Sequence, residues 1–194
     1  MSRREATIAA GWFDALYRSD PDPWRFRTSE YEREKFRATL GALRRSHYGQ
    51  VLEVGCAIGV LTRQLAPRCD HLLAIDGSET ALDAARRECA AEDNVTFACR
   101  MVPDGFPDGR YDLIVLSEVL YYLVAADLTA VADRCCDALL PGGEIVLCHW
   151  LGETDYPLTG QEASELFADV ALRRSLERER LAEDAYLLER FRAA

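Results

Sequence analysis

The sequence has no long hydrophobic run and no excess of positive charge. None of its apolar stretches approaches the ~18 residues that a membrane-spanning helix needs. The beginning of the chain carries basic residues and a short apolar patch without a cleavage site, so we do not interpret it as a signal peptide. The net charge is −10, whereas phosphate contacts need clustered Lys and Arg. We therefore expect a cytoplasmic protein that spans no membrane and binds no nucleic acid.

Signatures of metal or disulfide chemistry are also missing. The sequence has seven cysteines, an odd number, and no two of them form a CxxC pair. It has three histidines, and none is spaced from a cysteine as metal ligands usually are. Several cysteines fall inside apolar strand or helix patterns, which favours reduced thiols in a protein core. We therefore expect neither a metal site nor a disulfide.

The segment 1–46 contains helix patterns and no strand pattern. Apolar residues recur at helical spacing over 7–18 and 29–43, and a breaker-rich loop at 19–23 separates these segments. Between residues 25 and 45, seven basic residues accompany three acidic ones, against the acidic total. We interpret this excess as an exposed helix face that carries ion pairs four residues apart.

Strand and helix patterns then alternate as far as residue 150, which indicates βαβ units and a parallel sheet. Ser78 is the expected N-cap of the helix predicted at 79–91. The expected strands are 51–54, 71–76, 94–99, 111–117 and 144–150. The expected helices are 60–66, 79–91 and 127–140, the last ended by Pro141-Gly142-Gly143.

The pattern changes after residue 150. A helix is expected near 161–168, and two weaker strands near 170–178 and 184–191 form an antiparallel pair because their connection is short. The predicted fold class is α/β, a Rossmann-like open sheet of about seven strands. The sheet is mostly parallel with an antiparallel C-terminal edge strand, has helices on both faces, and is preceded by an N-terminal helical lid.

The loop Gly55–Gly59 follows the first strand of the alternation. Ligands bind at the carboxyl ends of strands in open α/β sheets, where glycines let the backbone approach them. A dinucleotide fingerprint needs glycines at positions 1, 3 and 6, but Ala57 and Val60 occupy the last two. Asp76 ends the next strand, where a carboxylate can accept hydrogen bonds from both ribose hydroxyls of an adenosine. The sequence therefore predicts a nucleoside site that is not a dinucleotide site.

Four motifs resemble those of class I S-adenosylmethionine-dependent methyltransferases, over residues 50–150. They are Glu53-x-Gly55-x-x-x-Gly59, Asp76, the strand motif at 111–115 and the turn at 140–143. Ala57 stands where many members of that class have a third glycine. Further segments resemble the nodulation-type N-methyltransferases, which methylate the free amine of a deacetylated chitooligosaccharide. These segments are 20–27, 31–34, 52–57 and 117–123.

This resemblance implies a cofactor site for S-adenosyl-L-methionine, with S-adenosyl-L-homocysteine as the product. It implies that the chain 1–194 is one methyltransferase domain, with a helical cap at 1–46, a cofactor-binding core at 47–150 and an acceptor-side segment at 151–194. The implied cofactor contacts comprise the loop under the methionine part, the ribose and adenine contacts, the sulfonium side and two lid residues. They are Glu53, Gly55, Cys56, Ala57, Gly59, Asp76, Gly77, Arg100, Met101, Ser117, Trp24 and Arg33, with Arg25 as the alternative to Arg33 for the cofactor carboxylate.

An amine acceptor must lose a proton before or during attack, which requires a base within hydrogen-bond reach. The candidates are Glu118, Tyr122 and His149, with Tyr121 as a packing residue because adjacent side chains rarely share a direction. Glu118 is also interpreted as a possible helix cap. We expect Tyr17 and Trp12 only to dock the first helix.

Other candidate functions stay open at this point. The leading hypothesis is methyl transfer to a small polar amine, with an amino sugar or oligosaccharide as the candidate acceptor. The alternatives are a small-molecule O-methyltransferase and a domain that binds S-adenosylmethionine without catalysis. Trp150, Tyr156 and Asp155 are residue types that suit a sugar site. We expect the protein to be a monomer or a homodimer.

Overall fold

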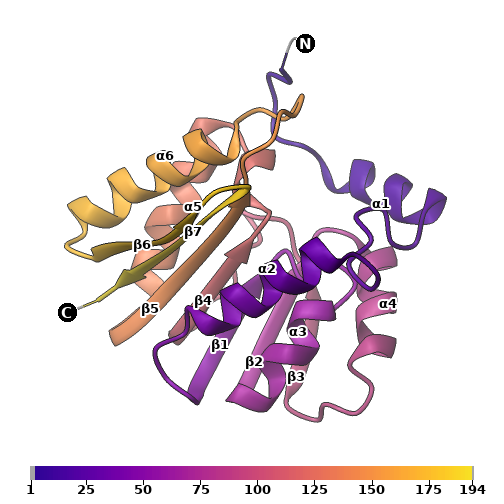
Figure 1. Ribbon diagram of the computed structural model, residues 1–194, viewed down its shortest axis with the longest axis horizontal. Coiled ribbons are helices and arrows are strands. Elements are labelled where there is room, and N and C mark those ends of the chain that lie inside the picture. The colour runs from indigo at the N-terminus through magenta and orange to yellow at the C-terminus, as the bar shows by residue number, and fades with distance from the viewer. Residues whose placement is uncertain (1–2, 194) are drawn as a thin grey trace. The chain divides into compact units, whose positions relative to one another are not determined.

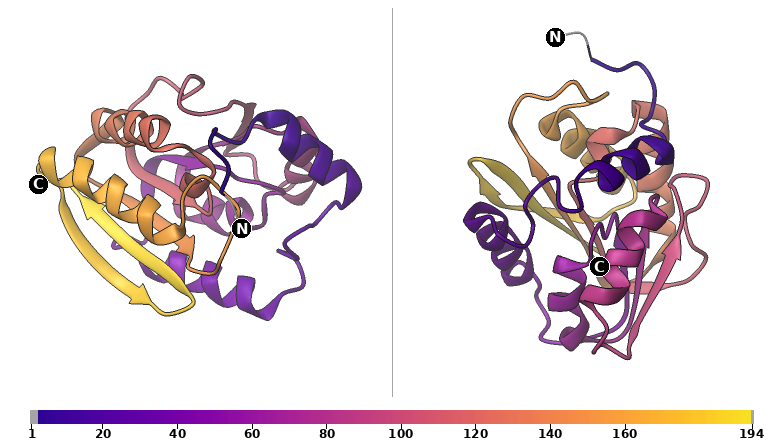
Figure 2. Two further views of the ribbon diagram at one scale, coloured as in Figure 1. Left: turned by 90° about the horizontal axis from the view of Figure 1, so that it is seen from above. Right: turned by 90° about the vertical axis from the view of Figure 1, so that its right-hand side faces the viewer.

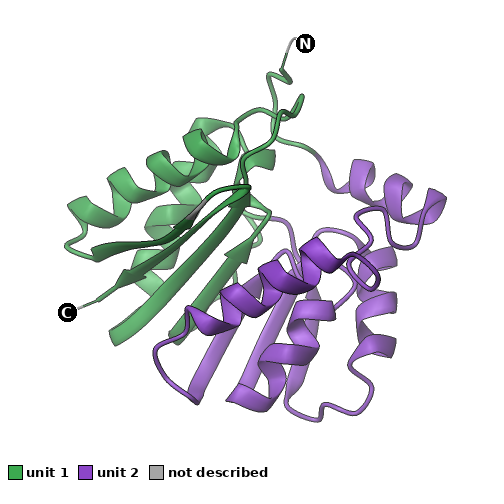
Figure 3. Cartoon of the chain, in the orientation of Figure 1, with its two compact units in different colours: residues 1–8, 102–194 green, residues 9–101 purple. Residues whose placement is uncertain are grey.

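The computed structural model describes residues 3–193, which divide into two compact units (Figure 3). Unit 2 is Ala9–Met101, and unit 1 combines Met1–Ile8 with Val102–Ala194. No helix within the described part of the chain has the length and hydrophobicity that crossing a bilayer requires.

Unit 2 contains the first three strands, which are parallel and lie in the order β3-β2-β1 (Figure 1). Leu52 pairs with Leu73, and Ala74 pairs with Phe97. The elements are α1 (Ala10–Ser19), α2 (Glu30–Gly41), β1 (Tyr48–Val54), α3 (Val60–Leu65), η1 (Ala66–Arg68), β2 (Cys69–Asp76), α4 (Glu79–Glu88) and β3 (Val95–Cys99).

The core of unit 2 explains why these segments fold as they do. Strand β1 is buried from Val51 to Val54, and Leu72, Ala74 and Ile75 of β2 are buried beside it, as in strands covered on both faces. Leu82 of α4 and Ile58 of the loop after β1 are fully buried with them. Ser78 is the N-cap of α4, and its hydroxyl accepts a hydrogen bond from the Ala81 backbone N–H at 3.2 Å, as predicted.

Unit 1 contains the other four strands, in the order β4-β5-β7-β6. Strands β4 and β5 are parallel, and β7 is antiparallel to both β5 and β6, which confirms the predicted antiparallel pair. Helices α5 and α6 pack against each other, and α6 also contacts β5, β6 and β7 (Figure 2). The elements are β4 (Tyr111–Ser117), η2 (Leu120–Tyr122), α5 (Ala125–Ala138), β5 (Leu139–Trp150), α6 (Gly160–Arg173), β6 (Glu177–Glu183) and β7 (Tyr186–Arg192).

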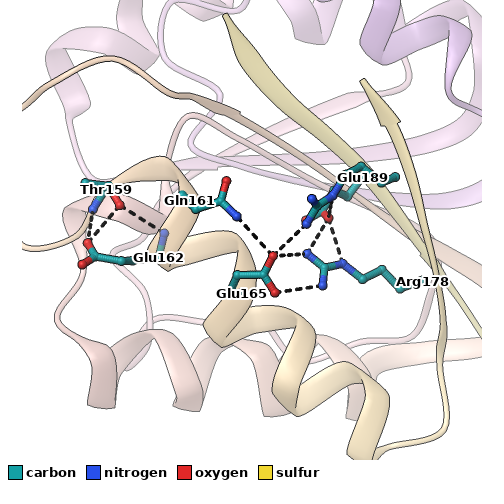
Figure 4. A network of polar contacts seen from close by, with 7 residues as sticks. Thr159, Gln161, Glu162, Glu165, Arg178 and Glu189 are labelled. Carbon is teal, nitrogen blue, oxygen red and sulfur yellow. Dashed lines mark hydrogen bonds and ion pairs between the residues drawn. The ribbon is translucent and has the colours of Figure 1, made fainter. Parts of the chain in front are cut away.

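A charged network connects α6 to the two C-terminal strands (Figure 4). The Arg178 guanidinium donates to both carboxylate oxygens of Glu165, at 2.8 and 2.9 Å, and to Glu189 at 2.8 Å. Glu189 is fully buried, and burying a carboxylate is costly unless a donor such as the Arg178 guanidinium satisfies it. The α6 N-terminus is closed by a capping box, in which the Thr159 hydroxyl and the Glu162 carboxylate satisfy each other's backbone N–H groups.

Two expected boundaries in unit 1 are wrong. Helix α5 ends at Ala138, and Pro141-Gly142-Gly143 lies inside β5 instead of ending a helix, because Leu139 already pairs with Tyr111. Helix α6 continues to Arg173 and β6 begins only at Glu177, so the strand expected at 170–178 starts too early. The apolar side chains of α6 recur at helical spacing and are buried through Ala171, which prolongs the helix.

Lys35 corrects the expectation of an exposed basic face on α2. Its side chain is buried, and its Nζ lies 2.9 Å from Glu32 Oε1 and 5.1 Å from the centre of the Tyr31 ring. The remaining basic residues of the segment are exposed, and Arg33 forms an ion pair with Glu30. A charge count cannot distinguish a buried lysine from exposed ones, because burial depends on what packs against the helix.

Gly59 allows a close approach between α3 and α4. Its φ is +82°, and a Cβ added there would lie 2.9 Å from the Ala85 Cα.

We predict that Gly59→Ala lowers the free energy of unfolding by about 2–4 kcal/mol, because left-handed strain adds to a clash with backbone. Gly11→Ala is the matched control, since nothing lies within 4 Å of its added Cβ. Urea denaturation measures both, and equal midpoints for Gly59→Ala and wild type would contradict the packing described.

Candidate functional site

The turn after β1 is a tight loop built on left-handed residues. Gly55, Ala57 and Gly59 have φ values of +78°, +50° and +82°. The backbone N–H groups of Gly55 and Cys56 both donate to the Ile75 carbonyl, at 2.8 and 3.0 Å. The left-handed region explains the two glycines, and Ala57 occupies it at a cost of the order of 1 kcal/mol.

Asp76 ties this turn to the following helix. Its Oδ2 accepts a hydrogen bond from the Ala57 N–H, and its Oδ1 accepts one from the Ser78 N–H, both at 2.9 Å. Burial raises the pKa of Asp76 to about 6, although the backbone donors of Ser78 and Ala57 oppose the shift. Each carboxylate oxygen can accept a further hydrogen bond. The predicted ribose contact is therefore at the centre of the loop, with acceptor capacity left for two hydroxyls.

Glu53 lies below the same turn and is almost fully buried. Burial raises its pKa to about 7, and the nearby charge of Asp76 acts in the same direction. Its Oε2 has no hydrogen-bond partner among the residues that the structure describes. A buried acceptor without a donor is rare in native proteins and is typical of a site that a ligand or water completes. Glu53, Asp76 and the left-handed turn therefore fit the nucleoside cofactor that the motifs imply.

Gly77 and Met101 lie directly against each other beside Asp76. A Cβ added to Gly77 would lie 2.7 Å from the Met101 sulfur. The Arg100 N–H donates to the Asp76 carbonyl at 2.9 Å, while the Arg100 side chain is exposed. Met101 is half-buried, so its thioether offers a polarizable surface next to the proposed ribose position.

One face of α1 covers the turn after β2, which the sequence did not reveal. A Cβ added to Gly77 would contact Ala10. Asp14 Oδ1 accepts hydrogen bonds from the Ser78 hydroxyl at 2.5 Å and from the Thr80 N–H at 3.3 Å. Tyr17 is buried on the same face, and burial followed by the charge of Asp76 raises its pKa well above the usual range. The available signal in the sequence was the spacing of Ala10, Asp14 and Tyr17, which are four and three residues apart and therefore lie on one face of the helix.

The lid residues differ in their surroundings. Trp24 is half-buried, with its ring centre 5.7 Å from that of Tyr17. Its loop is held by Asp22, whose carboxylate accepts from the backbone N–H groups of Phe26 and Arg27. The structure therefore places Trp24 beside Tyr17, which lies near Asp76. Arg33, in contrast, is exposed on α2.

In unit 1, Glu118 follows β4 in a left-handed conformation with φ +58°. Its Oε2 accepts a hydrogen bond from the Tyr121 hydroxyl at 2.7 Å and one from the Trp150 N–H at 2.9 Å. The short helix η2 has Val119 as its N-cap, without a side-chain cap, so Glu118 does not cap it. Left-handed strain at a non-glycine residue that holds two donors is typical of a functional position.

Tyr121, Tyr122 and Tyr156 form an aromatic cluster beside Glu118. The Tyr121 and Tyr156 rings are stacked at 5.4 Å, and Tyr122 meets both edge-on, at 4.8 and 4.6 Å. Burial, followed by the charge of Glu118, raises the pKa of Tyr121 well above its usual range, so Tyr121 stays a donor. The tyrosine hydrogen-bonded to Glu118 is therefore Tyr121, which the sequence treated as packing.

His149 and Ser117 complete the residues expected in this unit. His149 is fully buried at the end of β5, and its Nε2 accepts a hydrogen bond from the Leu120 N–H at 3.3 Å. This contact fixes the turn that carries Tyr121 and Tyr122. The Ser117 hydroxyl is buried and has no hydrogen-bond partner within residues 3–193.

Fold and site together define a class of protein. The solved chain of the N-methyltransferase NodS from Bradyrhizobium japonicum, in complex with S-adenosyl-L-homocysteine, aligns with 96% of this chain and 99% of its own length, at a TM-score of 0.79 and 26% sequence identity. The seven strands thus have a Rossmann-like methyltransferase fold, which confirms the predicted mostly parallel open sheet.

The particular family follows from the sequence match. The family model of Nodulation protein S (NodS) matches residues 15–148, and the chain belongs to this family. Nodulation protein S of Rhizobium tropici is 35% identical over 127 residues, which cover 64% of this chain and 53% of that protein. The Sinorhizobium fredii protein is 36% identical over 128 residues, which cover 64% and 59%. The chain spans about half the length of these curated relatives.

Glu53 makes stability depend on pH. Its pKa is about 7 in the folded chain, against an ordinary value of 4.5, so the folded state holds the proton more tightly. The free energy of unfolding therefore falls as pH rises from about 4.5 to about 7 and is level above that range. We predict that Glu53→Gln removes this part of the slope and raises stability at pH 8 by roughly 1–3 kcal/mol.

Urea denaturation between pH 4 and pH 9 measures this effect. Glu34→Gln, at an exposed position of α2, is the matched control and should keep the wild-type slope. A Glu53→Gln variant with the wild-type pH slope would contradict a pKa raised by burial at Glu53.

Proposed function

We propose that the protein transfers a methyl group from S-adenosyl-L-methionine to a small polar acceptor, an amine nitrogen of an amino sugar or oligosaccharide. The observation that carries the proposal is the Asp76 carboxylate, held between the Ala57 and Ser78 N–H groups beside a left-handed glycine turn. Membership of the NodS family supports it, and the solved NodS relative is described as an N-methyltransferase with S-adenosyl-L-homocysteine.

In this proposal the cofactor is held by residues of unit 2. Asp76 accepts from the ribose hydroxyls, and the turn Gly55–Gly59 lies under the methionine part. The buried Glu53 orders that turn from below, and Met101 packs beside Gly77 against the adenosine. The bound cofactor supplies an activated methyl group on its sulfonium, so the protein has to supply position and a dry site instead of covalent chemistry.

Glu118 is the proposed base for the acceptor. The acceptor nitrogen must lose a proton before or during attack. The Glu118 carboxylate receives that proton, while the Tyr121 hydroxyl and the Trp150 N–H fix its Oε2. Tyr122 contributes to the aromatic wall, and His149 positions the η2 turn through the Leu120 N–H.

The proposal treats the whole chain as one methyltransferase domain, since one solved chain aligns with 96% of it. It includes a cytoplasmic location, with which seven free thiols are compatible. It also includes a monomer or a homodimer as the active form, acting on a small molecule.

The proposal predicts methylation of partly deacetylated chitotetraose and none of the fully acetylated tetramer. We expect Glu118→Gln to lower kcat about a hundredfold or more, because the proton acceptor is lost, and Tyr121→Phe to lower it roughly tenfold. The measurement is methyl transfer from labelled cofactor, with the methylated atom located by mass spectrometry and NMR.

Glu177→Gln, on the exposed strand β6, is the matched control and should keep wild-type activity. Wild-type activity in Glu118→Gln would remove Glu118 from the base role. Methylation at oxygen would favour the O-methyltransferase alternative, and cofactor binding without any transfer would favour the non-catalytic one.

A further inference from the structure

Trp150 is the one exposed aromatic residue in the described part of the chain, with 40% of its surface accessible. It ends β5, next to the fully buried His149, and pairs with Tyr186 of β7. A single exposed apolar side chain is ordinary on a protein surface. Trp150 differs because its position is fixed by contacts on several sides.

Two glycines hold Trp150 in place. A Cβ added to Gly152 would lie 2.0, 2.3 and 2.4 Å from three carbons of the indole, so the ring lies against the Gly152 backbone. A Cβ added to Gly160 would lie 2.1 Å from the Trp150 carbonyl oxygen. Neither position tolerates a side chain without displacing Trp150. The indole therefore packs on one side against the Gly152 backbone, while 40% of the Trp150 surface is accessible.

The same residue is directly connected to the proposed base. The Trp150 N–H donates to Glu118 Oε2 at 2.9 Å, and the same oxygen accepts from the Tyr121 hydroxyl. The residue that carries the exposed ring thus also holds the Glu118 carboxylate through its backbone N–H. A molecule that rests on the indole would lie close to the group that we assign to proton removal.

We propose that the Trp150 indole is a stacking platform for a pyranose ring of the oligosaccharide acceptor. This inference rests on the proposed function and specifies its acceptor site. In a β-linked glucosamine ring the substituents are equatorial, so each face presents only axial C–H groups and packs flat on an aromatic ring. The hydroxyl groups at the edge of the pyranose ring stay in water, because the indole is partly exposed.

The platform distinguishes a sugar from a small amine. An amine without a ring would gain nothing from the indole, whereas each stacked pyranose would lower the dissociation constant. Trp150→Ala keeps the backbone N–H that Glu118 accepts and removes only the indole, so we expect KM for the oligosaccharide to rise by a larger factor than kcat falls.

The test measures binding of fully acetylated chitotetraose by calorimetry, with and without S-adenosyl-L-homocysteine. This probe has no free amine, so binding is read without catalysis. We expect Trp150→Ala to weaken binding about tenfold or more, and Trp150→Phe to restore it to within about threefold of wild type. Gly152→Ala should also weaken binding, because the new methyl group displaces the indole. Leu172→Ala, an exposed apolar residue on α6, should change nothing.

Two results would overturn the platform. One is wild-type affinity in Trp150→Ala, and the other is failure of the wild-type chain to bind the tetramer at millimolar concentration. If the tetramer binds through Trp150 but no amino sugar is methylated, the platform stands and the proposed function fails. If amino sugars are methylated with an unchanged KM in Trp150→Ala, the function stands and the platform fails.

Discussion

The hydrogen bonds of Asp76 hold together the turns that follow β1 and β2 in unit 2. One carboxylate joins the turn after β1, through the Ala57 N–H, to the turn after β2, through the Ser78 N–H. Ser78 in turn donates its hydroxyl to Asp14 of α1, so a helix far earlier in the sequence is anchored to the same point. A buried carboxylate is costly unless donors surround it, which explains why backbone N–H groups converge on it.

Unit 1 contains a carboxylate in a comparable place. Glu118 also follows a strand, and it also binds a backbone N–H from a different segment, that of Trp150. Glu118 differs from Asp76 because it also accepts a hydrogen bond from a side chain, the Tyr121 hydroxyl, and because its backbone is left-handed. Asp76 thus accepts from backbone donors alone, whereas one oxygen of Glu118 is fixed by a backbone and a side-chain donor.

Much of the fold was predictable because the signals are local. Strand β4 has the predicted limits, and Ser78 caps α4 as its residue type and position indicate. The turn Gly55–Gly59 and Asp76 were predictable for the same reason, since φ preference and a carboxylate at a strand end are properties of short segments.

What could not be predicted depends on packing between distant segments. Nothing in adjacent tyrosines indicates that Tyr121, and not Tyr122, donates to Glu118, because the turn geometry of η2 decides it. Asp14 and Tyr17 face the Asp76 turn because α1 docks on α4, and Lys35 is buried although its neighbours in the sequence are charged. The length of α6 follows from the burial of its apolar side chains, which recur at helical spacing, against β5 and β7.

The central claim is that Asp76 holds the ribose of S-adenosyl-L-methionine. Calorimetry with S-adenosyl-L-methionine, S-adenosyl-L-homocysteine and NAD tests it on wild type, Asp76→Ala, Asp76→Asn and the exposed control Asp93→Ala, with thermal unfolding to establish that each variant is folded. The account predicts micromolar binding of the first two ligands by wild type and Asp93→Ala, weaker binding by Asp76→Asn, and none by folded Asp76→Ala. Binding of NAD alone, or unchanged affinity in Asp76→Ala, would contradict it.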